Sequence, residues 1–123
     1  MTNIEQLIEE SSEILNDSGI VNDGQVWRFQ RTYAVTLKPT RHSATRRIKL
    51  LVEINHDASY SYQSHYRISK WDGNQWHVVV YREPESQEMK DLTSGYTRKL
   101  DLIGNDADHV AYDLLVDALR IIV

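Results

Sequence analysis

The spacing of apolar residues in the first part of the chain is that of an amphipathic helix. Between residues 3 and 17 they recur at intervals of three and four, which gathers them on one side of a helix and leaves most glutamates on the other. The stripe consists of Ile4, Leu7, Ile8, Ile14 and Leu15, with Ser11 at the remaining position. Thr2 and Glu5 form a capping box, and Gly19 suits the left-handed residue that ends many helices. We therefore predict a helix over residues 3–17.

From residue 25 onward apolar and polar positions alternate, which is the pattern of a half-buried strand. In residues 25–38 the apolar side is formed by Trp27, Phe29, Tyr33, Val35 and Leu37. Pro39 ends this strand, because it lacks the N–H that a continuing ladder needs. Two similar runs cover residues 47–55 and 60–68, and a fourth strand follows the turn Asp72-Gly73-Asn74. Since the last connectors are short and rich in turn formers, we predict consecutive hairpins that form a meander.

The last turn decides which side chains of the fourth strand face the core. A two-residue loop would set Ile68 opposite His77, whereas a three-residue loop sets Ile68 opposite Val78 and Tyr66 opposite Val80. The second register keeps apolar residues on one face of the sheet. We therefore predict the three-residue loop.

Most aromatic residues fall on the apolar side of this pattern and are expected in the core. They are Trp27, Phe29, Tyr33, Tyr60, Tyr62, Tyr66 and Trp76. Only Trp71 and Tyr81 are expected to point outward or to lie at an edge. Platforms for single-stranded bases are built from several exposed sheet aromatics beside cations, so two are too few to predict one.

The end of the chain carries a second amphipathic helix, for which Asn105 is a good N-cap. Its apolar stripe consists of Ala107, Ala111, Leu114, Leu115, Ala118, Leu119 and Ile122. Before it, residues 85–92 are compatible with a short helix, and residues 96–103 with a fifth strand or an extended connection. The resulting fold class is α+β. We predict a two-layer antiparallel meander of four or five strands, packed by N- and C-terminal helices in a single domain over residues 1–123.

The composition is that of a folded domain without cysteine chemistry. The chain has 123 residues, 41% of them hydrophobic, which is enough to bury one core. It contains no Cys, so disulfides, thiolate zinc sites and cysteine nucleophiles are excluded. The first residues do not resemble a secretion leader, and no apolar run reaches the length of a membrane span. We expect a cytoplasmic protein that does not bind a membrane.

The net charge of −4 conceals a strong asymmetry along the chain. Residues 1–23 carry six acids and no Lys or Arg, and residues 83–123 carry nine acids against four bases. Residues 24–82, which include the predicted strands, carry ten bases against three acids. The prediction is therefore a positively charged sheet between two acidic helices, and such asymmetry can report on partners.

Residue types that carry catalysis or bind metals do not occur in an informative spacing. The five histidines include no HExxH or HxH frame, and the GxSxG, P-loop and GxGxxG motifs are absent. His109 lies three residues after Asp106 and four before Asp113, which suits either a tuned general base or the polar back of an amphipathic helix. We favour the second interpretation, and we expect no catalytic residue, no metal site and no cofactor.

The remaining feature is the basic sheet with its longest loop, residues 38–49. We predict a binding surface formed by Arg28, Lys38, Arg41, Arg46, Arg47, Lys49, Arg67 and Trp71. Cations on a sheet and its hairpin tip can bind phosphates or an acidic protein surface, and they can also simply prevent edge-to-edge association.

The expected function is a non-catalytic macromolecular interaction module, as small regulatory, inhibitory or assembly proteins of bacteria and phages often are. A protein partner is favoured, because a nucleic-acid binder more often has a basic overall charge. The alternative is a nucleic-acid-binding module that uses the hairpin Arg41–Lys49. A pocket for a small ligand beneath the helices is less favoured. Self-association stays open, because the sheet has free edges and the C-terminus is apolar.

Overall fold

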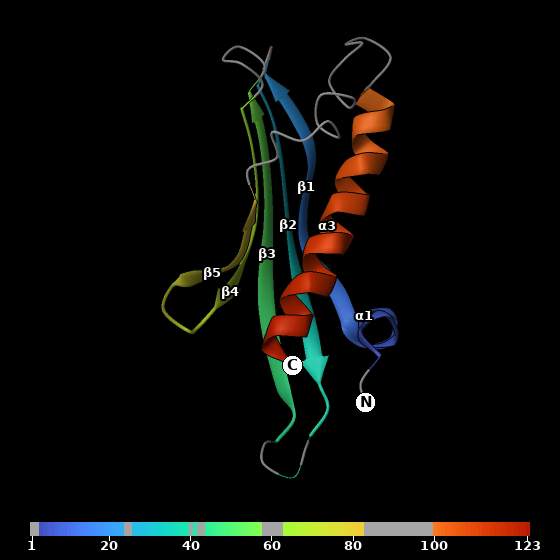
Figure 1. Cartoon of the computed structure of the whole chain (residues 1–123), viewed down its shortest axis with the longest axis vertical. Coiled ribbons are helices and arrows are strands. Elements are labelled where there is room, and N and C mark those ends of the chain that lie inside the picture. Colours follow the sequence, from blue (N-terminus) through green and yellow to red (C-terminus); the bar gives the residue numbers. More distant parts are fainter. Residues whose placement is uncertain (1–2, 24–25, 40, 42–43, 58–62, 83–99) are drawn as a thin grey trace.

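A computed structural model describes residues 3–23, 26–39, 41, 44–57, 63–82 and 100–123. The elements follow in the order α1 (Ile4–Ser11), β1 (Ser12–Asp23), β2 (Val26–Leu37), β3 (Arg46–Asp57), β4 (Gln63–Trp71), β5 (Trp76–Arg82) and α3 (Leu100–Ile122). The strands form one antiparallel sheet in the order β1-β2-β3-β4-β5, and α3 runs obliquely over one of its faces (Figure 1). The predicted α+β class and the meander are confirmed.

The N-terminal helix is shorter than predicted. It ends at Ser11, and the last two apolar members of the predicted stripe belong to β1. The cap is Asn3, whose Oδ1 accepts a hydrogen bond from the N–H of Gln6 at 3.1 Å. The prediction was wrong because a helical period shows which residues a segment would bury if it were a helix, but not whether the helix forms. The free edge of β2 offers most of residues 12–23 a backbone pairing partner, and this pairing overrides the local preference.

The fifth strand of the sheet is β1, at the N-terminal edge. Residues 100–103, which the sequence assigned to a strand or an extended connection, are instead part of α3. This helix begins at Leu100, before the predicted cap Asn105. The predicted helix over residues 85–92 and the remaining residues 96–99 lie outside the described residues.

The turn between β4 and β5 is longer than predicted. Trp71 pairs with Trp76, so four residues, Asp72–Gln75, form the loop instead of three. Because side chains alternate between the two faces of a strand, one additional loop residue exchanges the faces of the residues that follow. Trp76 is therefore not in the core.

A bulge in β5 then restores the original alternation. Ser69 pairs with Val78 and Ile68 pairs with Val80, which leaves Val79 as the inserted residue. The predicted pairing of Ile68 with Val78 was wrong. An alternating pattern cannot reveal a bulge, since the extra residue changes the facing of side chains without changing their character.

The core lies between α1, α3 and one face of the sheet. Its buried side chains include those of Phe29, Tyr33, Val35, Leu37, Ile48, Leu50, Val52, Ile54, Tyr66 and Ile68 from the strands. The helices contribute Leu7, Ile8, Ala107, Ala111, Leu114, Leu115, Val116, Ala118 and Leu119. Among the described elements, both helices pack on this one face. The other face of the sheet is not covered by either of them.

No helix in the described part of the chain combines the length and the apolar character needed to cross a bilayer.

We expect Leu114→Ala to lower the free energy of unfolding by about 2–5 kcal/mol, because Leu114 is fully buried and its loss leaves a cavity. Ile121→Ala is the matched control on the same helix: Ile121 is 65% exposed, and its change should stay within about 0.5 kcal/mol. Urea unfolding of both variants measures the difference. Equal losses would contradict the orientation of α3.

Candidate functional site

The face of the sheet that neither described helix covers, which we name the outer face, collects side chains from all five strands. Residues directly opposite in an antiparallel pair share a face, so the register defines its members. They include Glu13, Arg28, Gln30, Thr32, Ala34, Arg47, Lys49, Leu51, Glu53, Asn55, His65, Arg67, Ser69, Trp71, Trp76, Val78 and Tyr81. Three rungs cross this face. The first joins Thr32, Leu51, Ser69 and Val78, the second Gln30, Glu53, Arg67 and Tyr81, and the third Arg28, Asn55 and His65.

Two tryptophans meet at the end of the outer face where β4 turns into β5. The rings of Trp71 and Trp76 are tilted at 57° with their centroids 5.2 Å apart, and Trp76 is 39% exposed. Val78, two residues further along β5, is 53% exposed. Large apolar side chains with this exposure form a hydrophobic surface patch.

Asp72 holds the turn that positions these rings. Its Oδ1 accepts hydrogen bonds from the backbone N–H groups of Asn74 at 2.7 Å and Gln75 at 2.8 Å, and its own N–H donates to the carbonyl of Gln75 at 3.1 Å. Its second carboxylate oxygen meets Nε2 of His77. Gly73 supplies the left-handed residue, with φ of 103°. The N–H donors of Gln75 and Asn74 and the contact with His77 lower the pKa of Asp72 to about 2.

An ion pair occupies the middle of the outer face. Nε and Nη2 of Arg67 donate to the two oxygens of Glu53 at 2.9 and 3.1 Å, and the amide of Gln30 donates to the same carboxylate at 3.3 Å. The carboxylate is largely shielded, since the Glu53 side chain is 13% exposed, while Arg67 stays more open. The hydrogen bonds to Glu53 raise the pKa of Arg67, despite the opposing effect of burial.

His65 and Tyr81 lie beside this ion pair. Nδ1 of His65 is 2.7 Å from the hydroxyl of Tyr81, and the ring centroids are 6.0 Å apart. Tyr81 is also among the exposed large side chains. The outer face therefore carries aromatic surface at the turn and again at its second rung.

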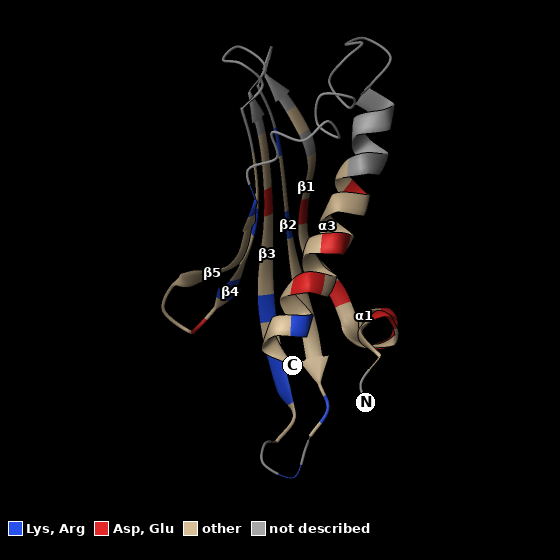
Figure 2. Ribbon diagram, in the orientation of Figure 1, with Lys and Arg blue, Asp and Glu red and all other residues tan. Residues whose placement is uncertain are grey.

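The structure divides the predicted binding residues between two places. Arg28, Arg47, Lys49, Arg67 and Trp71 lie on the outer face. Lys38 and Arg41 lie in the connection that joins β2 and β3, and Arg46 begins β3 beside it, about 30 Å from Arg28 at roughly 3.3 Å per residue. Figure 2 shows this basic end on β3, and the acidic residues on α1 and α3. The sequence treated the eight as one surface, because it does not reveal how far apart two positions of a long strand lie.

Not all of these cations are available to a partner. Arg47 pairs with Glu13 of β1, and Arg67 with Glu53. Arg28 and Lys49 form no ion pair with another residue whose side chain is described. Both can therefore meet a ligand without breaking an ion pair of the described residues.

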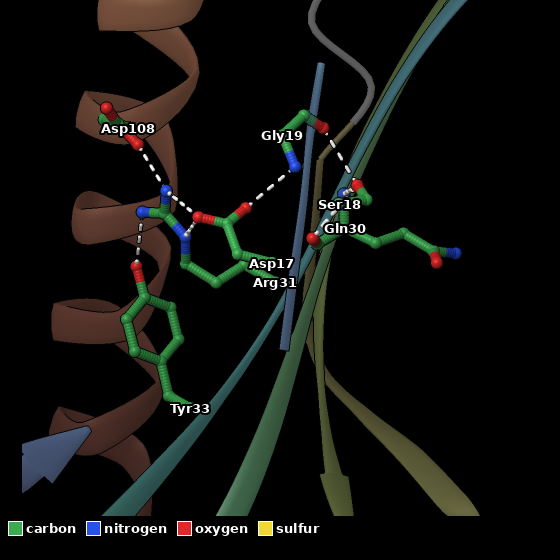
Figure 3. Close-up of polar contacts among 7 residues, drawn as sticks. All are labelled: Asp17, Ser18, Gly19, Gln30, Arg31, Tyr33 and Asp108. Carbon is green, nitrogen blue, oxygen red and sulfur yellow. Dashed lines mark hydrogen bonds and ion pairs between the residues drawn. The ribbon is translucent and has the colours of Figure 1, made fainter. Parts of the chain in front are cut away.

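On the opposite face, Arg31 forms a cluster that the sequence analysis missed (Figure 3). Its side chain is 12% exposed and lies over the rings of Phe29 and Tyr33, 4.8 and 5.9 Å from their centroids. Nε and Nη2 donate to Asp17 of β1 at 3.1 and 2.7 Å, and Nη2 also reaches Asp108 of α3 at 2.6 Å. The available signal was an arginine at the position where the apolar alternation of β2 is interrupted.

The bonding of Arg31 is that of a structural clasp. Its remaining Nη1 donates to the hydroxyl of Tyr33 at 3.2 Å, so every nitrogen of the guanidinium has a partner. Burial alone would lower its pKa, but the hydrogen bonds with Tyr33, Asp17 and Asp108 raise it, and the group stays charged. It joins β1, β2 and α3 and leaves little capacity for a ligand.

The Asp17 end of the clasp depends on a bulge in β1. Residues 18 and 19 interrupt the ladder, and Gly19 takes a φ of 61°. The hydroxyl of Ser18 replaces the missing backbone partners: it accepts from the N–H of Gln30 at 3.0 Å and contacts the carbonyl of Gln30 at 3.2 Å. The N–H of Gly19 donates to Asp17 at 2.9 Å. Burial raises the pKa of Asp17, but Arg31 and this N–H lower it by more.

His109 lies on α3, at an exposed position. Nε2 of His109 is 3.5 Å from Asp113, and both side chains are exposed on α3. In the part of the chain that the structure describes, no three His, Asp or Glu residues are grouped to hold a metal ion. The acid–base proposal for His109 gains no support from this geometry, since nothing encloses the pair.

Comparisons with protein-family models, with curated proteins and with solved structures found no match. The functional argument therefore depends on the geometry of the outer face.

We expect Arg31→Met to lower the free energy of unfolding by about 1–3 kcal/mol, since it leaves Asp17 without its charged donor. Met retains much of the apolar stem, so the loss reports on the clasp. Arg120→Met, at an exposed position of α3, is the control and should be nearly neutral. Urea unfolding at neutral pH compares them, and equal stabilities of the two variants would contradict the role of the clasp.

The low pKa of Asp72 predicts a contribution to stability that is present at neutral pH and is lost only in acid. A carboxyl whose folded pKa is depressed stabilises the fold above its unfolded pKa, and this contribution is lost as the pH falls toward about 2. NMR titration of the Asp72 carboxyl should give a midpoint near 2, and Asp72→Ala should loosen the turn at neutral pH. An ordinary midpoint near 3.8 would show that the turn does not hold the carboxylate.

Proposed function

We propose that the protein is a non-catalytic interaction module that binds an anionic macromolecule through the outer face of its sheet. The observation that carries this proposal is the exposure of Trp76 and Val78 on the outer face, which also carries Arg28 and Lys49. Aromatic residues and arginine are enriched among the few interface residues that contribute most of the binding free energy. A surface that binds nothing needs no such cluster.

The charge of the outer face supports an anionic partner. Among the residues whose side chains are described, it holds four cations, Arg28, Arg47, Lys49 and Arg67, and two carboxylates, Glu13 and Glu53. Both an acidic protein surface and a nucleic acid meet this description. The acidity of the whole chain favours the protein partner, and a cytoplasmic location and self-association stay predictions from the sequence.

The hairpin is the competing surface, since Lys38, Arg41 and Arg46 are exposed there. In the described part of the hairpin they are not accompanied by aromatic or large apolar side chains. Charge without apolar contact supports weak binding that salt screens easily. The outer face offers both contributions and is therefore the preferred site.

Retention on immobilised polyglutamate and heparin at low salt tests the proposal. We expect Val78→Glu to abolish retention, because it sets a negative charge on the outer face at an exposed position of β5. Ile121→Glu, at an exposed position of α3, is the matched control and should elute like the wild type.

Two further variants separate the surfaces. Arg28→Ala with Lys49→Ala should elute earlier than Lys38→Ala with Arg41→Ala, although each removes two cations. Wild-type protein that neither resin retains would refute the proposal. Equal elution of V78E and I121E would exclude the outer face as the site.

A further inference from the structure

We propose that the outer face is a stacking platform for single-stranded nucleic acid. The inference rests on the proposed function and names the partner of that same surface. It arises because the pairing of β4 with β5 places an aromatic residue on a different face from the one that the sequence pattern predicts. The four-residue turn moves Trp76 from the expected core to the outer face, where it lies against Trp71.

The aromatic side chains are spaced along the strands. The tryptophan pair lies at the turn, and Tyr81 with His65 lies on the rungs beyond Val78. Trp76 and Tyr81 are five positions apart on a bulged strand, roughly 13–16 Å at the usual rise. Successive unstacked bases can therefore contact the two aromatic groups in turn, as they do on other open antiparallel sheets.

The cations lie where the backbone of such a strand would pass. Lys49 precedes Leu50, where the pairing of β3 with β4 ends, on the side of Trp71, and Arg28 belongs to the rung that contains Asn55 and His65. Arg67 lies between them. Its Nη1 is not used by Glu53, so it can still donate to a phosphate while the ion pair persists.

Polar side chains that can contact base edges lie on β2 and β3, beside the strands that carry the aromatic groups. Gln30 and Asn55 carry amide groups on the second and third rungs, and Thr32 carries a hydroxyl on the first.

The overall charge of −4, which favoured a protein partner, does not describe this surface. Much of the negative charge belongs to α1 and α3, which pack on the opposite face of the sheet, as the red segments of Figure 2 show. Binding depends on the local electrostatic field, and the described side chains of the outer face carry a net positive charge. A duplex hides the faces of its bases, and therefore gains nothing from exposed rings.

The two partner classes require different properties of Trp76. A base needs the face of an aromatic ring, whereas a polypeptide needs buried apolar area. Trp76→Phe retains a ring, and Trp76→Leu retains only apolar bulk. Single-stranded nucleic acid should tolerate the first and lose affinity with the second, while a protein partner should respond alike to both.

The experiment is fluorescence anisotropy with labelled oligothymidylate and oligouridylate over a range of salt. We expect wild-type binding at low salt, with Trp76→Leu and Tyr81→Leu roughly 5- to 100-fold weaker and the two Phe variants close to wild type. Arg28→Ala should reduce the steepness of the salt dependence by about 0.7 in the logarithmic plot, the share of one phosphate. Tyr112→Leu is the matched control, since Tyr112 is 38% exposed on α3 and Trp76 39% on β5.

The outcomes separate the two proposals. Retention on polyglutamate with no oligonucleotide binding would overturn this inference and leave the proposed function standing. Equal competition by duplex, or equal affinities of Trp76→Phe and Trp76→Leu, would also overturn it. No binding to any polyanion would refute both. Thermal melting of each variant checks that the fold is intact, and Tyr81→Leu tests the platform independently if Trp76→Leu loosens the turn.

Discussion

The packing of the α3 leucines against the inner face of the sheet is the interaction on which the rest of the structure depends. Leu114, Leu115 and Leu119 are fully buried and lie in one cluster with Leu50, Val52 and Ile68. Nonpolar burial of this kind is the main favourable contribution to folding. Because it requires only one face of the sheet, it leaves the outer face free to carry cations and aromatic rings.

Polar ties hold the helix in a defined position over this core. Arg31 connects β2 to Asp17 and Asp108, and Arg82 of β5 pairs with Asp117 near the other end of α3. Hydrophobic contacts are not directional, so a leucine stripe alone would allow the helix to slide or rotate. Arg31 thus connects the N-terminal half of α3 to β2, and Arg82 connects its C-terminal half to β5. The negative charge of α3 therefore contributes to the fold as well as to the surface.

The outer face depends on two irregularities. The turn held by Asp72 contains one residue more than the simplest pattern, and the bulge at Val79 compensates for it further along β5. Between the turn and the bulge, the residues of β5 that the alternating pattern predicts in the core lie on the outer face instead. Trp76 and Val78 become exposed for this reason, and Trp76, a core residue of the predicted register, becomes part of the candidate binding surface.

Several properties followed from the sequence alone: the α+β class, the order of strands β2 to β5, the buried stripe of α3 and the positive charge of the sheet. Each is a repeated pattern in which many residues agree, so a local irregularity does not change the result. Tertiary structure decided the features that depend on one contact or one residue of register. The free edge of β2 turned residues 12–17 from the predicted helix into a strand. Asp17 and Asp108 made Arg31 an internal clasp, and the four-residue turn before β5 exposed Trp76. These outcomes depend on partners that are distant in sequence or on a one-residue slip, and neither is visible in the spacing of hydrophobic and polar residues.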